Sequence, residues 1–563
     1  MTQETNNEQN DIIIPKDSFV FIPIGGSTEI GMNCYLYGYK GKWLAVDCGI
    51  GFADENLPGV DVLLPDTKFI AEHKKDLVGL IITHAHEDHI GAVAYLWQDF
   101  QCPIYVTPFA YELLEGKLNE ENLLKRAHVE IVEKGAVLDL DPFEVEFISM
   151  THSIPEPNAL AIRTEKGTVV HTGDWKFDNN SLIGEKADIP TLKQLGKEGV
   201  LALVSDSTNV FVETQDNTEE DVRKSLEELF SHYPENKIVV TCFASNVVRL
   251  ESIYWAAHQN GRQVCLMGRS LWRIEDAARA VGYMKNIPQF LTEKEAMELP
   301  ENKVVYVCTG SQGEPFSALT KVANTKQGNG SLHLHPGDVV VFSSRIIPGN
   351  EKEIALLQKK LLAQGASIIT EREYLVHVSG HPSQVEMKKL YQILKPKIAI
   401  PVHGEALQLA EHIQLSKSWG VPFTIVLQDG EVLDLDPQAP EIIGEVPTGI
   451  LAMDGKKIIP VNANVIRQRK KMLEGGTVVV TIVADKEGTL LGAPQVSSFG
   501  LLDEDSQEAE ELKQHIVDEE ALSKANKKIS DEDLKEAARL SVRRFLNENY
   551  GKKPVIEVHL VRI

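Results

Sequence analysis

The sequence predicts an α/β protein built from several layered domains, and three observations lead to this class. The chain has 563 residues, a length that suggests three or four domains or subdomains. Short apolar runs bounded by Gly, Pro and Asp alternate with helical patterns along most of the chain. Hydrophobic residues make up 43% and charged residues 25%, which excludes a mainly disordered chain, a collagen and a coiled-coil rod.

The first part of the chain combines a polar tail with a series of strands. Residues 1–12 are polar and acidic, and we expect a disordered, solvated tail there. Residues 13–210 are expected to form the first part of a core domain. Its apolar runs are short enough to be strands. We expect them at 19–23, 43–46, 77–83, 103–106, 143–149, 160–164 and 168–172, with helices between some of them.

A regular alternation of strands and helices begins near Thr218. Such alternation is typical of a parallel sheet covered by helices. We therefore expect a separate α/β domain inserted at 211–375. Its expected strands are 237–242, 263–267, 303–309 and 339–343, and its expected helices are 219–232, 247–259, 271–281 and 351–364.

The last part of the chain first returns to the style of the core and then changes. Residues 376–435, with strands at 398–402 and 423–427, are expected to complete the core domain. The stretch 436–465 begins with a Pro- and Gly-rich run and is interpreted as a linker. A small α+β domain is expected at 466–563, with strands at 477–483 and 555–561. A helix should begin after Ser530, where a capping signature precedes an acidic first turn.

Charge and cysteine usage limit the classes of function. The net charge of −25 argues against broad attraction to nucleic acid or to anionic membranes, so a nucleic-acid site would need local positive charge or bound metal ions. The six cysteines are scattered without a CxxC motif, which favours the reducing cytoplasm. No run approaches ~20 apolar residues, and the N-terminus lacks the pattern of a signal peptide, so no membrane association is expected.

The strongest motif is a run of metal-ligand residues directly after the predicted strand at 77–83. Three imidazoles and a carboxylate lie within six residues, at His84, His86, Asp88 and His89. A tight strand-to-helix turn aims such side chains into one cavity, whereas a helix would spread them. Histidine and aspartate are ligands of both zinc and manganese. The alternative is a solvated polar loop.

Further candidate ligands follow other predicted strands. His152 comes after the strand at 143–149, Asp174 after 168–172, His403 after 398–402, and Asp47 follows Ala45-Val46. In α/β folds, functional sites lie at the carboxyl ends of the strands. Taken singly, each of these residues is more simply structural, Asp47 for example as a turn residue before Gly49. Together with the histidine run they indicate one metal centre.

These motifs resemble those of the metallo-β-lactamase superfamily. The resemblance implies an αββα sandwich with a site for two divalent metal ions, with zinc as the first candidate and manganese as the second. It implies that His84, His86 and His152 hold one ion, that Asp88, His89 and His403 hold the other, and that Asp174 bridges both. Asp47 would orient the ligands from behind. Two such ions lower the pKa of a water molecule and neutralise charge on a phosphoryl or acyl oxygen, so the reaction class is hydrolysis.

The 229 residues that separate Asp174 from His403 leave room for the inserted domain, which resembles the β-CASP domain of nucleases. Asp206 matches its acidic motif A, His381 its motif B and His403 its motif C. Within this group the chain most resembles the bacterial ribonuclease J family. The matching segments are 25–26, 29–31, 152–156, 173–178, 243–246, 268–270, 309–315 and 348–350, together with the C-terminal α+β region.

The family resemblance implies 5′→3′ exoribonuclease activity together with endonuclease activity in RNA maturation and decay. A pocket for an RNA 5′-monophosphate would consist of two segments, namely Ser245, Asn246 and Val247, and His377, Val378, Ser379, Gly380 and His381. His381 would act as general acid, polarised by Asp206. Ser245-Asn246 also suits an N-cap of the following helix, and 377–381 a Gly turn with polar caps, so both structural interpretations stay open.

The sequence departs from the family pattern at several places and leaves rival functions open. Ser27-Thr28 replaces Leu-Gly, Ala85 replaces Gly, residues 344–347 replace Ser-Ser-Pro-Ile, and Lys456-Lys457 begins a replacement of a Gly- and Asp-rich stretch. The last change puts an additional structural ion in doubt. The expected partners are RNA, a second or further copies in a homodimer or homotetramer, and an RNA-degradation complex. The rivals are a β-CASP nuclease acting on DNA and a non-catalytic RNA-binding subunit.

Overall fold

A computed structural model of the chain describes residues 14–54, 56–178, 180–215, 217–325, 332–486, 489–503, 505–518 and 530–563. The tail expected at 1–12 lies outside these residues. The chain divides into two compact units. The first consists of Met1–Gly51 and Leu64–Gly449, and the second of Phe52–Leu63 and Ile450–Ile563.

Two mixed sheets form the core of the first unit. The eight-stranded sheet has the order β22-β21-β1-β2-β3-β6-β7-β8 and the seven-stranded sheet the order β20-β19-β13-β12-β11-β10-β9. In chain order the strands of the first sheet are β1 (Val20–Gly25), β2 (Cys34–Tyr39), β3 (Lys42–Val46), β6 (Leu77–Ile81), β7 (Ile104–Val106), β8 (Val129–Ile131), β21 (Glu431–Asp434) and β22 (Glu441–Glu445). Those of the second are β9 (Val137–Leu140), β10 (Phe143–Ser149), β11 (Asn158–Thr164), β12 (Gly167–His171), β13 (Ala202–Asp206), β19 (Ile398–Val402) and β20 (Phe423–Thr424).

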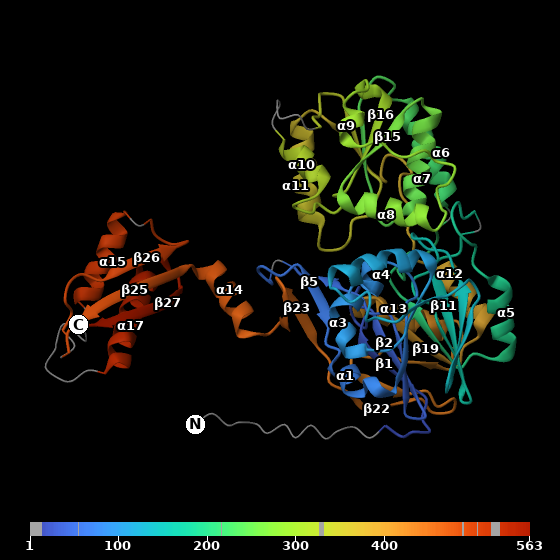
Figure 1. Cartoon of the computed structure of the whole chain (residues 1–563), viewed down its shortest axis with the longest axis horizontal. Coiled ribbons are helices and arrows are strands. Elements are labelled where there is room, and N and C mark those ends of the chain that lie inside the picture. Colours follow the sequence, from blue (N-terminus) through green and yellow to red (C-terminus); the bar gives the residue numbers. More distant parts are fainter. Residues whose placement is uncertain are drawn as a thin grey trace. The chain divides into compact units, whose positions relative to one another are not determined.

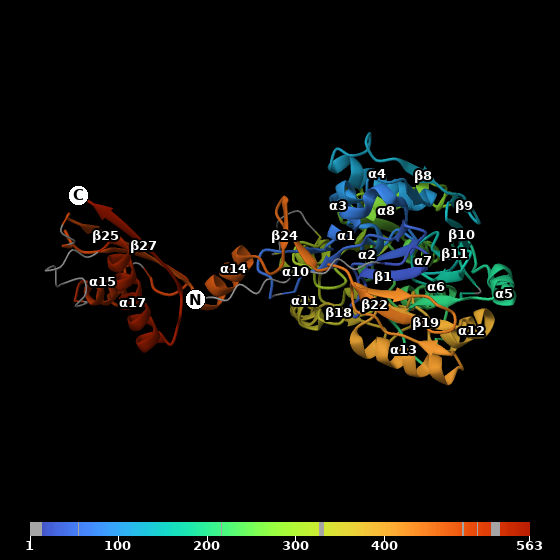
Figure 2. The same cartoon turned by 90° about the horizontal axis from the view of Figure 1, so that it is seen from below.

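The two sheets pack face to face, with helices on their outer faces. Phe21 and Tyr37 of the first sheet share a fully buried cluster with Phe147 and Leu160 of the second. Figure 2 shows α3 and α4 on one side of the strands and α12 and α13 on the other. The expected αββα sandwich is therefore confirmed. Its helices are α1 (Lys68–His73), α2 (Glu87–Ile90), α3 (Val93–Phe100), α4 (Pro108–Glu120), α5 (Ile189–Glu198), α12 (Gln384–Leu394) and α13 (Ala406–Ser418), and the short 3₁₀ helix η1 (Lys74–Asp76) precedes β6.

The inserted segment forms a five-stranded sheet in the order β15-β16-β14-β17-β18, in which every pair is parallel. Helices cover both faces, with α6 and α7 on one side and α10 and α11 on the other (Figure 1). The strands are β14 (Ile238–Thr241), β15 (Gln263–Met267), β16 (Val304–Cys308), β17 (Val339–Phe342) and β18 (Ser367–Ile369). The helices are α6 (Glu219–Ser231), α7 (Val247–Gln259), α8 (Arg269–Ala280), α9 (Glu293–Ala296), η2 (Glu301–Lys303), α10 (Ala318–Asn324) and α11 (Glu351–Ala363).

The second unit contains two small sheets. A three-stranded sheet, in the order β26-β25-β27, packs a buried cluster against two helices. A four-stranded sheet has the order β24-β23-β5-β4. The strands are β4 (Gly51–Phe52), β5 (Val62–Pro65), β23 (Ile450–Asp454), β24 (Lys457–Pro460), β25 (Thr477–Ala484), β26 (Gln495–Phe499) and β27 (Val555–Arg562), and the helices are α14 (Asn464–Gly475), α15 (Gln507–Asp518) and α17 (Asp531–Tyr550). None of the helices in the described ranges is long and apolar enough to cross a bilayer.

The stretch 436–465, interpreted from sequence as a linker, differs from that interpretation. It holds β22, β23 and β24, and its Ala452 is fully buried in a cluster with Val60 and Ile466. These strands are short, and most of their residues are half-buried or exposed, so they give a weak hydrophobic pattern. Tertiary pairing orders these strands where the local sequence does not predict them: β22 pairs with β21, and β23 lies beside β5 (Val62–Pro65), almost 400 positions earlier.

Candidate active site

The candidate site lies at the carboxyl ends of strands from both sheets of the sandwich. Asp47 follows β3, the run His84–His89 follows β6, and His152 follows β10. Asp174 follows β12, Asp206 ends β13 and His403 follows β19. Since these strands end at one edge of the sandwich, their loops converge there, as the sequence predicted.

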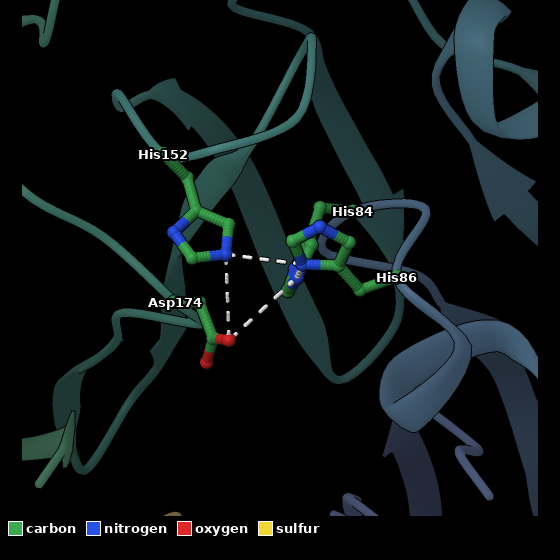
Figure 3. Close-up of side chains that lie close together, drawn as sticks. All are labelled: His84, His86, His152 and Asp174. Carbon is green, nitrogen blue, oxygen red and sulfur yellow. Dashed lines mark hydrogen bonds and ion pairs between the residues drawn. The ribbon is translucent and has the colours of Figure 1, made fainter. Parts of the chain in front are cut away.

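The first group of side chains consists of His84, His86, His152 and Asp174, whose ligand-type atoms all lie within 4.8 Å of one another (Figure 3). Nδ1 of His86 lies 3.2 Å from Nε2 of His84 and 3.0 Å from Nε2 of His152. Oδ2 of Asp174 lies 3.8 Å from Nε2 of His84 and 3.6 Å from Nε2 of His152. Three nitrogens and one carboxylate oxygen thus surround a common centre.

The second group consists of Asp88, His89, His403 and again Asp174. Nε2 of His89 lies 3.6 Å from Oδ2 of Asp88 and 3.4 Å from Oδ1 of Asp174. Nε2 of His403 lies 3.7 Å from Oδ2 of Asp88 and 3.5 Å from Oδ2 of Asp174. The two groups share only Asp174, so its carboxylate lies between two adjacent centres.

The donor set fits divalent metal ions. Nδ1 of His84 contacts the Thr83 hydroxyl at 3.0 Å, and Nδ1 of His152 donates to the carbonyl of Gly380 at 2.7 Å. With Nδ1 engaged in this way, each ring turns the lone pair of Nε2 toward the centre. Oδ1 of Asp174 is buried without a hydrogen-bond partner among the described residues. A bound cation would satisfy this oxygen.

Protonation states of the first group agree with this fit, whereas in the second group burial lowers the pKa of His89 but the negative charges of Asp174 and Asp88 outweigh it and raise that pKa well above its usual value. Burial lowers the pKa of His84 and His152 well below the usual range and that of His86 to about 4, so these imidazoles are neutral at pH 7. Burial opposes ionisation of Asp174, but the facing histidines, His403 first, outweigh it and hold its pKa well below the usual range. Neutral imidazoles and an ionised carboxylate are the forms that bind metal.

Asp47 stands behind the second group. It adopts the left-handed conformation with φ 62°, and its Oδ2 accepts hydrogen bonds from Nδ1 of His89 at 2.7 Å and from the Thr83 hydroxyl at 2.8 Å. Its Oδ1 accepts from the backbone N–H of Thr83 at 2.8 Å. Two positions after Asp47, Gly49 must be glycine, because a Cβ there would lie 1.6 Å from the carbonyl oxygen of Asp88. Asp47 therefore orients His89, and the loop after β3 lies in direct contact with the loop after β6.

Asn33 belongs to the same support and was not predicted. Its Oδ1 accepts from Nδ1 of His403 at 3.1 Å and from the Tyr35 hydroxyl at 2.7 Å. Its Nδ2 donates to the carbonyl of Asp88 at 3.0 Å. One amide thus aligns ligands from two distant segments. A single Asn in a Gly-rich loop has no spacing pattern that would reveal this role.

His381 and Asp206 form a pair beside the two groups. Nδ1 of His381 lies 2.7 Å from Oδ2 of Asp206 and 3.9 Å from Oδ2 of Asp174. Burial lowers the pKa of His381, but the negative charges of Asp206 and Asp174 outweigh it and raise that pKa to about 9. The ring is therefore a proton donor at pH 7. A grouping of both residues with Asp174 and His403 also has ligand-type atoms within 4.8 Å, but Nδ1 of His381 is already engaged by Asp206.

The loop 377–381 lies directly against the first group. A Cβ on Gly380 would come 2.7 Å from Nδ1 of His152, so only glycine allows this approach. The carbonyls of Ser379, Gly380 and His381 accept from Gln215, His152 and Asn209 respectively. The N–H groups of Val378, Ser379 and Gly380 donate no hydrogen bond within the described part of the chain. Three carbonyls of the loop are thus engaged and three of its amide donors are free, whereas the N–H of His381 donates to the Ser379 hydroxyl at 3.2 Å.

The second predicted pocket segment lies at the start of α7. Asn246 caps this helix through Oδ1, which accepts from the N–H of Arg249 at 2.9 Å, so the capping interpretation is confirmed. Ser245 is half-buried, whereas the side chains of Asn246 and Val247 are buried, and the N–H of Val247 donates to the carbonyl of Ser245 at 3.0 Å. Arg249 joins this segment to the other one, because Nη1 donates to the carbonyl of Val376 at 2.9 Å and lies 3.5 Å from Nδ1 of His377.

Fold and site together define a metal-dependent hydrolase of the metallo-β-lactamase superfamily. Comparison with known families matches the "Metallo-beta-lactamase superfamily" over 28–215, "Ribonuclease J, beta-CASP domain" over 235–361, "Zn-dependent metallo-hydrolase RNA specificity domain" over 365–422 and "Ribonuclease J C-terminal domain" over 464–563.

Relatives narrow the class further. Ribonuclease J of Sinorhizobium meliloti is 43% identical over 97% of this chain and 98% of its own length. The ribonuclease J proteins of Synechocystis and Helicobacter pylori are 37% and 33% identical, over 85% and 97% of this chain and 75% and 80% of their own lengths. The chain therefore belongs to the ribonuclease J family and is a metal-dependent ribonuclease.

Proposed function

We propose that the protein degrades RNA from the 5′ end toward the 3′ end, prefers a 5′-monophosphate and also cuts internally, in RNA maturation and decay. The observation that carries this proposal is the position of loop 377–381, whose Gly380 carbonyl accepts from His152 at 2.7 Å. Free amide donors on that loop suit phosphate oxygens. A 5′-phosphate bound there lies close to the metal groups, which favours cleavage near the RNA end.

Two divalent ions bound by His84, His86, Asp88, His89, His152, Asp174 and His403 would lower the pKa of a water molecule and neutralise charge on the phosphoryl oxygens. We propose zinc as the first candidate and manganese as the second, since imidazole and carboxylate ligands accept both. Asp47 and Asn33 hold the ligand rings in place through the hydrogen bonds described above.

His381 is proposed as the general acid. Hydrolysis adds water to the phosphorus and breaks its bond to the 3′ oxygen of the preceding nucleotide, and that oxygen needs a proton to leave. His381 holds a proton at pH 7, and Asp206 fixes the ring and stabilises its charged form. The shortened RNA then carries a new 5′-monophosphate, which is again the preferred end.

Location and assembly are proposed on separate grounds. All six cysteines are free and buried, which suits a cytoplasmic protein. We propose a homodimer or homotetramer assembled through the second unit, and participation in an RNA-degradation complex. In support, β27 pairs only with β25 among the described strands, and Phe499 of β26 is 60% exposed.

The test compares RNAs of one sequence that carry a radiolabelled 5′-monophosphate or 5′-triphosphate, incubated with manganese or zinc and then with EDTA. Rapid release of labelled mononucleotide from the monophosphate form, abolished by EDTA, is expected. Equal internal cleavage of both RNAs would replace the exonuclease by an endonuclease. Faster cleavage of a matching DNA would favour the DNA nuclease, and binding without cleavage the non-catalytic subunit.

A further inference from the structure

Arg345 is an exposed cation on the loop between β17 and α11, at a place where the sequence departs from the family pattern. The backbone of this loop is fixed without the arginine side chain. Nε2 of Gln312 donates to the carbonyl of Arg345 at 2.8 Å, and Oε1 of Gln312 accepts from the N–H of Ile347 at 2.9 Å. The fold therefore holds the position of Arg345 and leaves its side chain available.

One side chain connects Arg345 to loop 377–381. Nη1 of Arg345 donates to Oδ1 of Asn209 at 3.0 Å. Nδ2 of the same Asn209 donates to the Ser379 hydroxyl at 2.8 Å and to the carbonyl of His381 at 3.1 Å. The side-chain amide of Asn209 thus bridges the guanidinium of Arg345 to loop 377–381, which carries the free N–H groups. Its Nε and Nη2 have no acceptor among the described residues.

The charges around this loop leave Arg345 as the uncompensated cation. Arg249 is buried and pairs with Glu219 through contacts of 2.9 and 3.2 Å, and Lys176 lies 3.5 Å from Asp178. No carboxylate in the described ranges pairs with Arg345. Burial lowers the pKa of His377 well below its usual value, and the charges of Arg249, Lys176 and Arg345 act on it in the same direction. The positive charges of all three cations therefore act on His377 of this loop, in a chain of net charge −25.

We propose that Arg345 binds a phosphate group of the RNA at the rim of loop 377–381 and sets the affinity for the RNA end. This inference rests on the proposed function. A guanidinium with a free Nε–Nη2 edge matches two phosphate oxygens in a bidentate contact, which a lysine cannot reproduce. The bound phosphate is either the 5′-terminal group or the first internal phosphodiester.

The experiment measures kcat and KM of the full chain for mononucleotide release from 5′-monophosphorylated RNA over a range of salt concentrations. Arg345→Gln should lower kcat/KM about tenfold, mostly through KM, because a charge-assisted hydrogen bond is lost at an exposed site. The slope of log(kcat/KM) against log[salt] should become shallower by about 0.7, the value for one phosphate contact on a single strand. Arg345→Lys should restore the slope but only part of the affinity.

The matched control is Lys359→Gln, which removes one exposed charge from the far end of α11 and should leave both quantities unchanged. If the effect of Arg345→Gln disappears with 5′-hydroxyl RNA, the bound group is the terminal phosphate; if it persists, it is the phosphodiester. A wild-type salt slope in Arg345→Gln, or a loss confined to kcat, would overturn the proposal and leave Arg345 as a structural support of Asn209. Failure of the wild-type chain to cleave RNA would instead refute the proposed function.

Discussion

Substitution of Gly380 by alanine tests whether loop 377–381 packs against His152 of the first ligand group as closely as the structure indicates. The new Cβ would lie 2.7 Å from Nδ1 and 2.8 Å from Cε1 of His152 and 2.8 Å from the Ser153 hydroxyl, whereas ordinary contact begins at 3.4 Å. The distance between the new Cβ and the His152 ring must therefore grow by about 0.7 Å. The His152 ring cannot move away without losing its hydrogen bond to the Gly380 carbonyl.

The expected loss follows from the cost of overpacking. Inserting a methyl group into such a contact costs about 1–3 kcal/mol, and breaking the partner of a metal-binding histidine lowers metal affinity roughly 10–100-fold. We therefore expect Gly380→Ala to bind metal about tenfold or more weakly, with a matching loss of ribonuclease activity at limiting metal that excess metal largely restores. Metal affinity is measured by competition with a chromogenic chelator.

Gly449→Ala is the control, because a Cβ there meets nothing closer than Asp66 Cβ at 3.8 Å. It should match the wild type in both measurements. Wild-type metal affinity in Gly380→Ala would refute the close packing of Gly380 on His152.

Three further predictions concern protonation and buried charge. Asp206→Asn removes the negative charge that raises the pKa of His381 to about 9, so the alkaline limb of the pH–rate profile should move to lower pH, and kcat should fall roughly 10²–10⁴-fold; an unmoved limb would contradict the general-acid role. Burial raises the pKa of Asp429 to about 7, above that of an unfolded chain, so this group destabilises the fold increasingly between about pH 4 and pH 7. Asp429→Asn should therefore raise the midpoint of urea unfolding at pH 8 and not at pH 4, and equal gains at both would exclude this cause. Glu219→Gln leaves the buried Arg249 without its counter-charge and should cost about 3–5 kcal/mol in urea unfolding, whereas Glu220→Gln at the half-buried neighbour should cost little, because its partner Lys224 is solvent-exposed.

The parts of the site that the sequence predicted are those whose chemistry is concentrated locally. The histidine run after β6 is unusual within six residues, and the strand-end positions of His152, Asp174 and His403 reveal the others. The structure brings all seven predicted ligands together in two groups that share Asp174. Whether they bind metal stays a prediction for the chelator measurement.

The parts that were missed depend on contacts between distant segments. Asn33 and Asn209 are single amides that contact His403 and His381, which lie 370 and 172 positions away, and the patterns around them are those of ordinary loops. Arg249 lies on a helix that was predicted with the bounds it has, yet its complete burial is visible only once Glu219, Ser343 and Val376 surround it. Tertiary pairing of this kind leaves no periodic trace in the sequence.

The second unit is discontinuous in sequence because it includes the segment Phe52–Leu63, and this limits where the chain can be truncated. A chain cut at Gly449 would keep β4 and β5 but lose β23 and β24, leaving Val62–Pro65 as an unpaired strand edge open to association with other chains. The same segment begins only five positions after Asp47. Shortened variants would thus be prone to aggregate, and producing the second unit by itself would require joining Phe52–Leu63 to the C-terminal segment.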